Sequence, residues 1–316
     1  MAAAFLTTLT QMFRIIFFLF VGYMFNRLHL VQRSAEPVLS KFVAMLFIPS
    51  LTLYSNMVEC RLDRLGTYAS WVIIGGCMWL GCSLVGCVLA KWFGENNADQ
   101  VGLYRYAFSF PNYGGVGTPL VLTLFGTAGL FQLNLFTFIN GVMTYSWGTP
   151  QLIPHKEKMT LRRFLQKFFN LNFICMLLGM TLGVLGATKW MPSIVLEIFS
   201  DLGDCYVPVA LLLTGFSIAD YPFSDVFSNK KLYLYSLLRL IVFPCILLVI
   251  LFVTKAPLML ATLTVLVYAC PCGMNVVVFP AAYDQDCKTG SGLVLVSSLG
   301  SVFTIPLIYS LVQYFF

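Results

Sequence analysis

Charged residues are scarce in this sequence: aspartate, glutamate, lysine and arginine together make up 10% of its 316 residues, while hydrophobic residues make up 59%. A soluble globular protein carries about 25% charged residues. With a mean hydropathy of +0.85, the chain is expected to have lipid as its main solvent. Its net charge of +6 then reflects basic residues in the loops that face the cytosol. No nucleic-acid partner is expected.

The sequence also lacks the signatures of an enzyme. It has no P-loop, its polar connections are too short for a soluble catalytic domain, and its two histidines, His29 and His155, lie in those connections. No carboxylate lies unambiguously in the middle of an apolar run, which argues against a simple carboxylate proton relay. The ten cysteines lie mostly within apolar runs and have no paired spacing, so we expect neither a disulfide framework nor a metal or other cofactor.

Long apolar runs dominate what remains. A helix needs roughly 20 residues to cross the hydrocarbon core, and ten runs meet that length, which predicts an all-α integral membrane protein with ten transmembrane helices. The runs are 5–28, 37–57, 67–92, 101–125, 128–149, 169–188, 193–219, 232–254, 257–283 and 290–315.

Lysine and arginine are distributed unevenly between alternate connections. One side collects eleven of them and the other side four. The first set is Arg27, Arg33, Lys91, Lys156, Lys158, Arg162, Arg163, Lys167, Lys230, Lys231 and Lys288, and the second is Arg61, Arg64, Lys189 and Lys255. Because cytosolic loops are rich in basic residues, we expect the first side in the cytosol and both termini outside the cell membrane.

The two halves of the chain mirror each other. Pro49 and Pro208, 159 residues apart, lie in the second and seventh runs, and Pro111 and Pro271, 160 apart, interrupt the fourth and ninth. With five runs in each half, the second half enters the membrane from the opposite side. We therefore predict two inverted five-helix repeats, 1–150 and 169–316, joined by a short cytosolic linker, 151–168.

The fourth run is interrupted in mid-span by prolines and glycines, which predict two half-helices with an unwound middle. Unwound backbone in hydrocarbon must face protein, water or a ligand. The half-helix after the break presents free N–H groups and the positive end of its dipole, a seat for an anion; a proline kink that serves packing alone is the alternative. The residues expected at the site are Pro111, Asn112, Tyr113, Gly114 and Gly115.

The ninth run repeats this pattern with Pro271, Cys272, Gly273, Met274 and Asn275. Asn112 and Asn275 are expected to meet if the two breaks cross, although an interhelical packing bond is the alternative role for Asn275. Cys270-Pro271-Cys272 has the form of a soft-metal motif, but the chain lacks the large domains of heavy-metal pumps. Arg239, about eight residues into the eighth run, either snorkels to the interface or contacts the substrate.

At these residues the chain resembles the auxin efflux carrier family, which includes the plant PIN transporters and bacterial malate-permease-like proteins. The resemblance spans nearly the whole chain. It is carried by Phe108-Ser109-Phe110-Pro111-Asn112, Gly117-Thr118-Pro119-Leu120, Ala269, Pro271, Gly273, Val278, Phe279, Tyr283, Phe42-Val43-Ala44 with Pro49, and Arg239 with Pro244.

The resemblance implies an elevator-type transporter like the sodium/proton antiporters and bile-acid symporters, with broken, crossing helices 4 and 9. Helices 1, 2, 6 and 7 would form a scaffold, often dimeric, and helices 3–5 and 8–10 a transport domain. The substrate would be a small organic anion, either an auxin-like monocarboxylate or a dicarboxylate such as malate, with Na⁺ or H⁺ coupling left open. Substrate contact is carried over to Asn112, with Thr52, Ser55 and Asn140 as further candidates. A membrane sensor that binds the ligand without transporting it is the rival.

Overall fold

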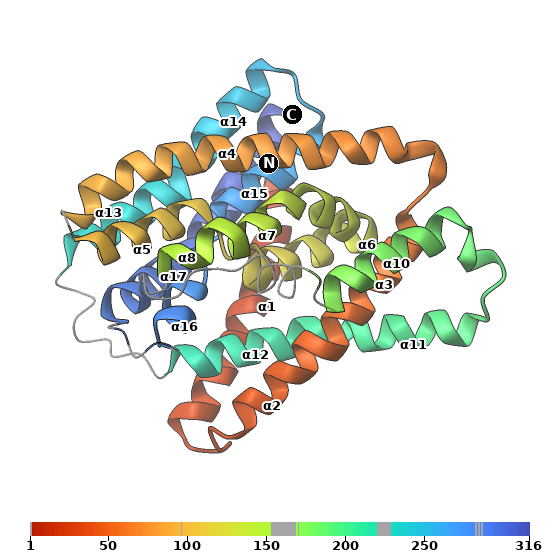
Figure 1. Cartoon of the computed structure of the whole chain (residues 1–316), viewed down its shortest axis with the longest axis horizontal. Helices are drawn as coiled ribbons and strands as arrows, with labels where there is room; N and C mark the ends of the chain where they lie inside the picture. The colour runs from red at the N-terminus through yellow and green to blue at the C-terminus, as the bar shows by residue number, and fades with distance from the viewer. Residues whose placement is uncertain are drawn as a thin grey trace.

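The computed structural model describes residues 2–95, 97–152, 169, 171–219, 229–281, 283, 285 and 287–316. Of the predicted linker 151–168, all but the first two residues lie outside these ranges. Within the described residues the chain is helical, and the sole β feature is an isolated bridge between Pro111 and Cys272 (Figure 1).

The helices fall within or close to the apolar runs expected from the sequence. In the first half they are α1 Ala2–Arg27, α2 Ala35–Phe42, η1 Val43–Phe47, α3 Ile48–Glu59, η2 Leu62–Arg64, α4 Leu65–Gly94, α5 Ala98–Ser109, η3 Tyr113–Gly117, α6 Thr118–Phe136, α7 Phe138–Met143, η4 Thr144–Gly148 and α8 Thr149–Leu152. In the second half they are α10 Leu171–Val184, η5 Ala187–Lys189, α11 Ser193–Asp204, α12 Tyr206–Ile218, α13 Lys230–Leu237, η6 Leu238–Val242, α14 Phe243–Val253, α15 Leu258–Ala269, α16 Asn275–Ala281 and α17 Lys288–Phe315.

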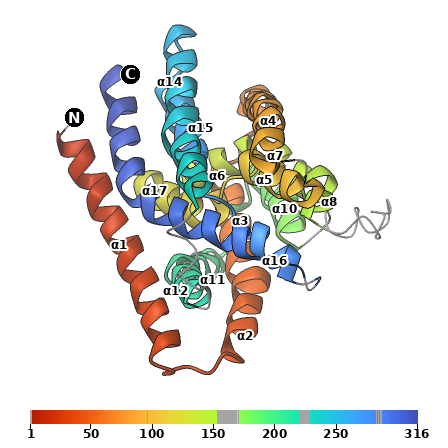
Figure 2. The ribbon, with the colours of Figure 1, turned by 90° about the vertical axis from the view of Figure 1, so that its left-hand side faces the viewer.

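Six helical stretches in the described residues are long and apolar enough to cross a membrane by length and composition: Leu9–Arg27, Ala35–Glu59, Leu62–Gly94, Tyr113–Phe136, Lys230–Val253 and Lys288–Phe315. Leu171–Val184 and Leu258–Ala269 are apolar but shorter. The chain is therefore a multi-pass integral membrane protein. The start of α1 and the end of α17 lie at the same end of the molecule (Figure 2).

One of these stretches contains a sharp break. Gly126 has φ 63° and ψ −157°, so α6 consists of two helical segments joined at a kink. Residues with a Cβ rarely adopt this backbone conformation, whereas glycine reaches it without steric cost. The sequence placed the boundary between the fourth and fifth runs at 125–128, where this kink occurs.

Proline explains four wide turns, of which three lie within helices and one, η3, begins the helix that runs on into α6. The five-residue π-turns η1, η3, η4 and η6 each end one residue before an X-Pro pair, at Pro49, Pro119, Pro150 and Pro244 respectively. A proline ring clashes with the carbonyl four residues earlier and offers it no N–H. A widened turn relieves that clash, and each of these helices continues beyond it.

Glycines let helices from the two halves of the chain cross closely. A Cβ on Gly22 of α1 would overlap the carbonyl oxygen of Leu212 in α12, and one on Gly215 of α12 would overlap that of Leu19 in α1. Gly179 and Gly183 of α10 meet the backbone of α3 in a similar way. Small residues permit this close approach, and packing rather than the hydrophobic effect holds helices together in lipid.

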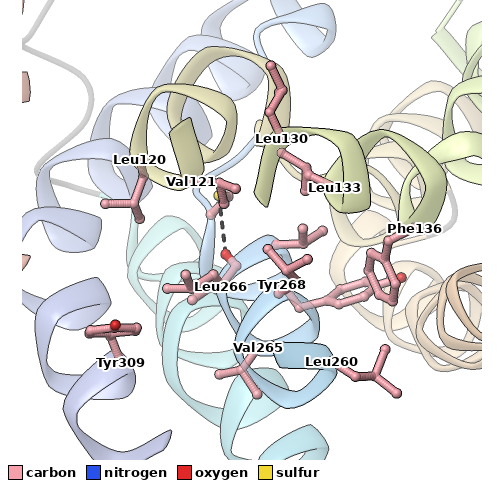
Figure 3. Packing of buried hydrophobic residues seen from close by; sticks show 14 of the residues in the cluster. Leu120, Val121, Leu130, Leu133, Phe136, Leu260, Val265, Leu266, Tyr268 and Tyr309 are labelled. Carbon is pink, nitrogen blue, oxygen red and sulfur yellow. Dashed lines mark hydrogen bonds between the residues drawn. The ribbon is translucent and has the colours of Figure 1, made fainter. Parts of the chain in front are cut away.

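The core that positions the broken helices lies between α6, α15 and α17. Figure 3 shows Leu120 and Val121 of α6 with Val265, Leu266 and Tyr268 of α15. All five belong to one buried cluster, and Leu120, Val121, Val265 and Leu266 are completely buried. The half-helices next to the two breaks are therefore packed against each other.

Candidate functional site

The two predicted breaks meet. α5 ends at Ser109 and α15 at Ala269, and the unwound segments that follow run antiparallel through the bridge between Pro111 and Cys272. The backbone N–H of Asn112 donates to the carbonyl oxygen of Pro271 at 2.9 Å. Each unwound segment thus supplies partners to the other, which removes part of the cost of exposed backbone inside a membrane.

Local sequence explains why each helix ends where it does. Phe110 and Cys270 precede prolines, and both are extended, with ψ of 100° and 146°. A residue before proline is disfavoured in the helical region. Two residues after Pro271, Gly273 lies so near Phe110 that a Cβ would be 3.3 Å from the Phe110 carbonyl oxygen. Glycine at this position leaves room for close approach of the two backbones, since a Cβ would make a tight contact with Phe110.

Asn112 begins the helix that follows the first break. Its side-chain Oδ1 accepts a hydrogen bond from the Gly115 N–H at 3.0 Å, and its carbonyl accepts from the Val116 N–H at 3.0 Å. Asparagine is among the preferred N-cap residues. The amides of Tyr113 and Gly114 are the other donors of this first turn, at the positive end of the helix dipole.

A cavity of about 260 Å³ opens beside the two breaks. Its described lining contains no charged side chain. The lining residues are Tyr106, Phe110, Pro111, Asn112, Tyr113, Gly114, Gly141, Thr144, Tyr145, Gly273, Met274 and Asn275. The cavity therefore combines aromatic walls with a few polar groups and one helix N-terminus, a combination typical of small-molecule sites.

Seven of the thirteen residues predicted for the site line this cavity: Pro111, Asn112, Tyr113, Gly114, Gly273, Met274 and Asn275. Gly115 contacts the side chain of Asn112 through its N–H. Pro271 and Cys272 form the backbone contacts of the crossing. Asn275 and Asn112 line the same cavity, but Asn275 donates through Nδ2 to the Tyr106 hydroxyl at 2.6 Å.

The predictions missed five lining residues: Tyr106, Phe110, Gly141, Thr144 and Tyr145. Gly141, Thr144 and Tyr145 have the spacing of one helical face. That spacing was visible in the sequence, but nothing in it indicated which face of the helix meets the breaks.

Thr52 lines a second cavity of about 240 Å³, which shares Tyr113, Gly141 and Tyr145 with the first. Asn140 lines neither cavity; it is buried, and its Oδ1 has no hydrogen-bond partner within the described residues. Ser55 is also fully buried and donates to the Thr52 carbonyl at 3.3 Å. The second cavity lies where α3 and α10 face α6 and α7.

Arg239 does not snorkel. Its side chain is completely buried, and Nη1 donates to the Phe108 carbonyl oxygen at 2.8 Å. It is also absent from the lining of the cavity beside the breaks. Snorkelling, one of the two roles considered from the sequence, is therefore wrong for this structure, while contact with a substrate stays a prediction. Position within the run could not reveal that α5 and α15 enclose this side chain.

An all-helical, multi-pass membrane protein with two broken helices crossing over an uncharged cavity has the form of a transport protein. The family model described as membrane transport protein matches residues 7–309. The chain belongs to this membrane transport family, that of the auxin efflux carriers. A comparison with curated protein sequences gave no match.

Proposed function

We propose that the protein is a secondary transporter that carries a small organic anion across the membrane by alternating access. The observation that carries this proposal is the antiparallel meeting of the Pro111 and Pro271 breaks beside a cavity. Discontinuous helices with paired breaks are a common way for transporters to build a substrate site at mid-membrane.

The chemistry of the cavity favours an anion. Its lining places the first-turn amides of Tyr113 and Gly114 at the positive end of the helix that runs on into α6. No carboxylate of the described residues lines the cavity to repel a negative ligand. Together with the adjoining cavity there is room for an auxin-like monocarboxylate or a dicarboxylate such as malate, whose anionic group would lie near Asn112.

We further propose that the chain forms ten spans in two inverted repeats of five. The glycine crossings support this arrangement, because α1 with α12 and α10 with α3 are equivalent helix pairs under such a repeat. Helices 1, 2, 6 and 7 would then form the scaffold, and helices 3–5 and 8–10 the moving transport domain. The site would lie between the two, where Thr52 of α3 faces Tyr113.

Both termini are proposed to lie outside the cell, and two copies are proposed to associate through their scaffolds. The membrane potential favours export of an anion from a negative cell interior by about 2.3 kcal/mol per charge per 100 mV. That free energy alone can drive efflux. Coupling to Na⁺ or H⁺ would change the direction, and ion gradients imposed across vesicles test for it.

Counterflow in proteoliposomes tests the proposal. Vesicles containing purified protein and unlabelled indole-3-acetate or malate should accumulate the labelled compound transiently and saturably, whereas protein-free vesicles should not. Binding of either compound without exchange would support the sensor instead, and flux without saturation would indicate a channel. Absence of both binding and counterflow for the whole range of small carboxylates would contradict the proposed substrate class.

A further inference from the structure

Arg239 is the largest completely buried side chain in the described part of the molecule. It lies on the π-turn η6, between α13 and α14. Within the described residues no carboxylate pairs with it, and its Nη2 has no hydrogen-bond partner. A buried charge without compensation costs several kcal/mol, so some other feature must balance this guanidinium.

The compensation comes from the ends of the two broken helices. Nη1 donates to the Phe108 carbonyl at 2.8 Å, and Nε donates to the Cys270 carbonyl at a longer 3.4 Å. Phe108 lies in the last turn of α5, and Cys270 is the C-cap of α15. One side chain thus contacts the C-terminal ends of both half-helices that lead into the crossing.

Charge arithmetic fits this arrangement. The C-terminus of a helix carries a partial charge equivalent to roughly −0.5. Two such ends together carry roughly one unit of negative charge, which balances the single positive charge of Arg239. A further contact supports the same interface: Tyr235, four residues earlier, donates through its hydroxyl to the Ala107 carbonyl at 2.8 Å. The face of α13 and η6 that carries Tyr235 and Arg239 therefore caps α5.

Removing the charge would affect the neighbouring cavity. Without Arg239, two negative helix ends would remain uncompensated just before Phe110 and Pro271, the first of which lines the cavity. An anion bound there would be repelled. We propose that Arg239 is a positioning residue whose charge holds the two breaks together and gives the cavity its preference for the anionic form of the ligand. This inference rests on the proposed function only for the identity of the ligand.

The test compares a carboxylate with its neutral amide. Dissociation constants for indole-3-acetate and indole-3-acetamide are measured on purified protein, and hydrogen exchange is followed at Asn112 in the absence of ligand. Arg239→Gln removes the charge but keeps a donor, and Arg239→Lys keeps the charge. Arg14→Gln is the matched control, because it removes one positive charge from an exposed position on α1.

Arg239→Gln should lower the preference for the acid over the amide roughly tenfold, the effect of one unit charge at about 10 Å and an effective dielectric constant of about 20. Exchange at the Asn112 amide should accelerate, while amides of α1 and α12 keep their protection. Arg239→Lys should retain the preference within about threefold, and Arg14→Gln should change neither quantity. A purely structural role would weaken acid and amide binding equally.

An unchanged preference, or unchanged protection of Asn112, in folded Arg239→Gln protein would overturn the inference. If Arg239→Gln gives no monodisperse protein, Arg239→Lys decides. Loss of the preference for the acid in Arg239→Lys would overturn the inference, and a retained preference would support it. A wild-type protein that does not prefer the acid would contradict the proposed anion site. In that case exchange at Asn112 alone would decide whether Arg239 holds the breaks together.

Discussion

Asn112 and Pro271, 159 residues apart, are joined by a 2.9 Å hydrogen bond from the backbone N–H of the first to the carbonyl of the second. The same asparagine caps the next helix through its side chain. It therefore has two tasks that a substitution can separate: it starts a helix, and it lines the cavity.

When Asn112 is replaced by aspartate or by alanine, the variant that is more stable should be the one that transports less. Asn112→Asp keeps a good N-cap but places a negative charge at the anion site, whereas Asn112→Ala loses about 1 kcal/mol of capping and adds no charge. We expect the aspartate variant to be the more stable in thermal unfolding and the weaker in carboxylate counterflow. Equal or better transport by the aspartate variant would contradict an anion site at Asn112.

Valine in place of Gly273 or Gly115 should abolish binding of the same ligand. A Cβ on Gly273 would lie 3.3 Å from the Phe110 carbonyl oxygen, and one on Gly115 would lie 2.7 Å from the Asn112 Oδ1. The larger side chain would separate the breaks in the first case and displace the cap in the second. Binding isotherms on monodisperse protein measure the effect.

Gly114→Ala is the control for folding, because a Cβ there meets nothing within 4 Å. It should leave the unfolding temperature unchanged. If the breaks serve packing alone, the valine variants will be less stable while their folded fraction binds with normal affinity.

Much of this architecture could be predicted because the responsible residues act locally. Pro111 and Pro271 each end a helix through their own ring and through the residue before it, so the breaks were visible in the sequence. Gly126 was not singled out, although its kink coincides with the predicted boundary between two runs.

What the sequence could not supply is the relation between distant elements. Arg239 was considered only for positions at the membrane interface or in the substrate site, because its contacts with Phe108 and Cys270 depend on tertiary packing. Ser55 was a candidate for substrate contact because of the family resemblance, yet its hydroxyl donates to the Thr52 carbonyl on its own helix. For Ser55 and Arg239, a polar group within an apolar run marks a buried hydrogen bond inside the protein.

The crossing of α1 and α12 should not tolerate even one added methyl group. A Cβ on Gly215 would overlap the Leu19 carbonyl oxygen, which is backbone and cannot rotate away. We expect Gly215→Ala to lower stability by about 1–3 kcal/mol. Gly81→Ala on α4, where nothing lies within 4 Å, should be neutral or slightly stabilising because alanine favours helix. Thermal unfolding in detergent distinguishes the two, and equal midpoints would show that the crossing is looser than described.

Orientation can be tested with single cysteines. The basic-residue distribution predicts that Ser34→Cys is cytosolic and Asp63→Cys external. An impermeant thiol reagent should label Asp63→Cys in intact cells, and Ser34→Cys only after the cells are opened. Exposed Cys77 and Cys205 and half-buried Cys287 should first be replaced. The segment between His155 and Thr160, also predicted to be cytosolic, lies outside the described residues. Labelling of Ser34→Cys in intact cells would show that the topology is the reverse of the one proposed.

The division into scaffold and transport domain predicts different effects for two similar tyrosines. Tyr206 of α12 donates to the Gly114 carbonyl at 2.6 Å, and Tyr235 of α13 donates to the Ala107 carbonyl at 2.8 Å. Under the proposed division, the first bond joins scaffold to transport domain and the second lies within the transport domain. Only the first must break when the transport domain moves.

Both tyrosine-to-phenylalanine variants should therefore lose a similar stability, about 1 kcal/mol for one hydrogen bond. Tyr206→Phe alone should change the rate of counterflow under saturating substrate, because it removes a bond that opposes the conformational change. Initial rates in proteoliposomes of matched protein content provide the measurement. If Tyr235→Phe alters the rate as much as Tyr206→Phe, the boundary between the moving and stationary helices does not run between α12 and the crossing. The elevator arrangement would then have to be redrawn.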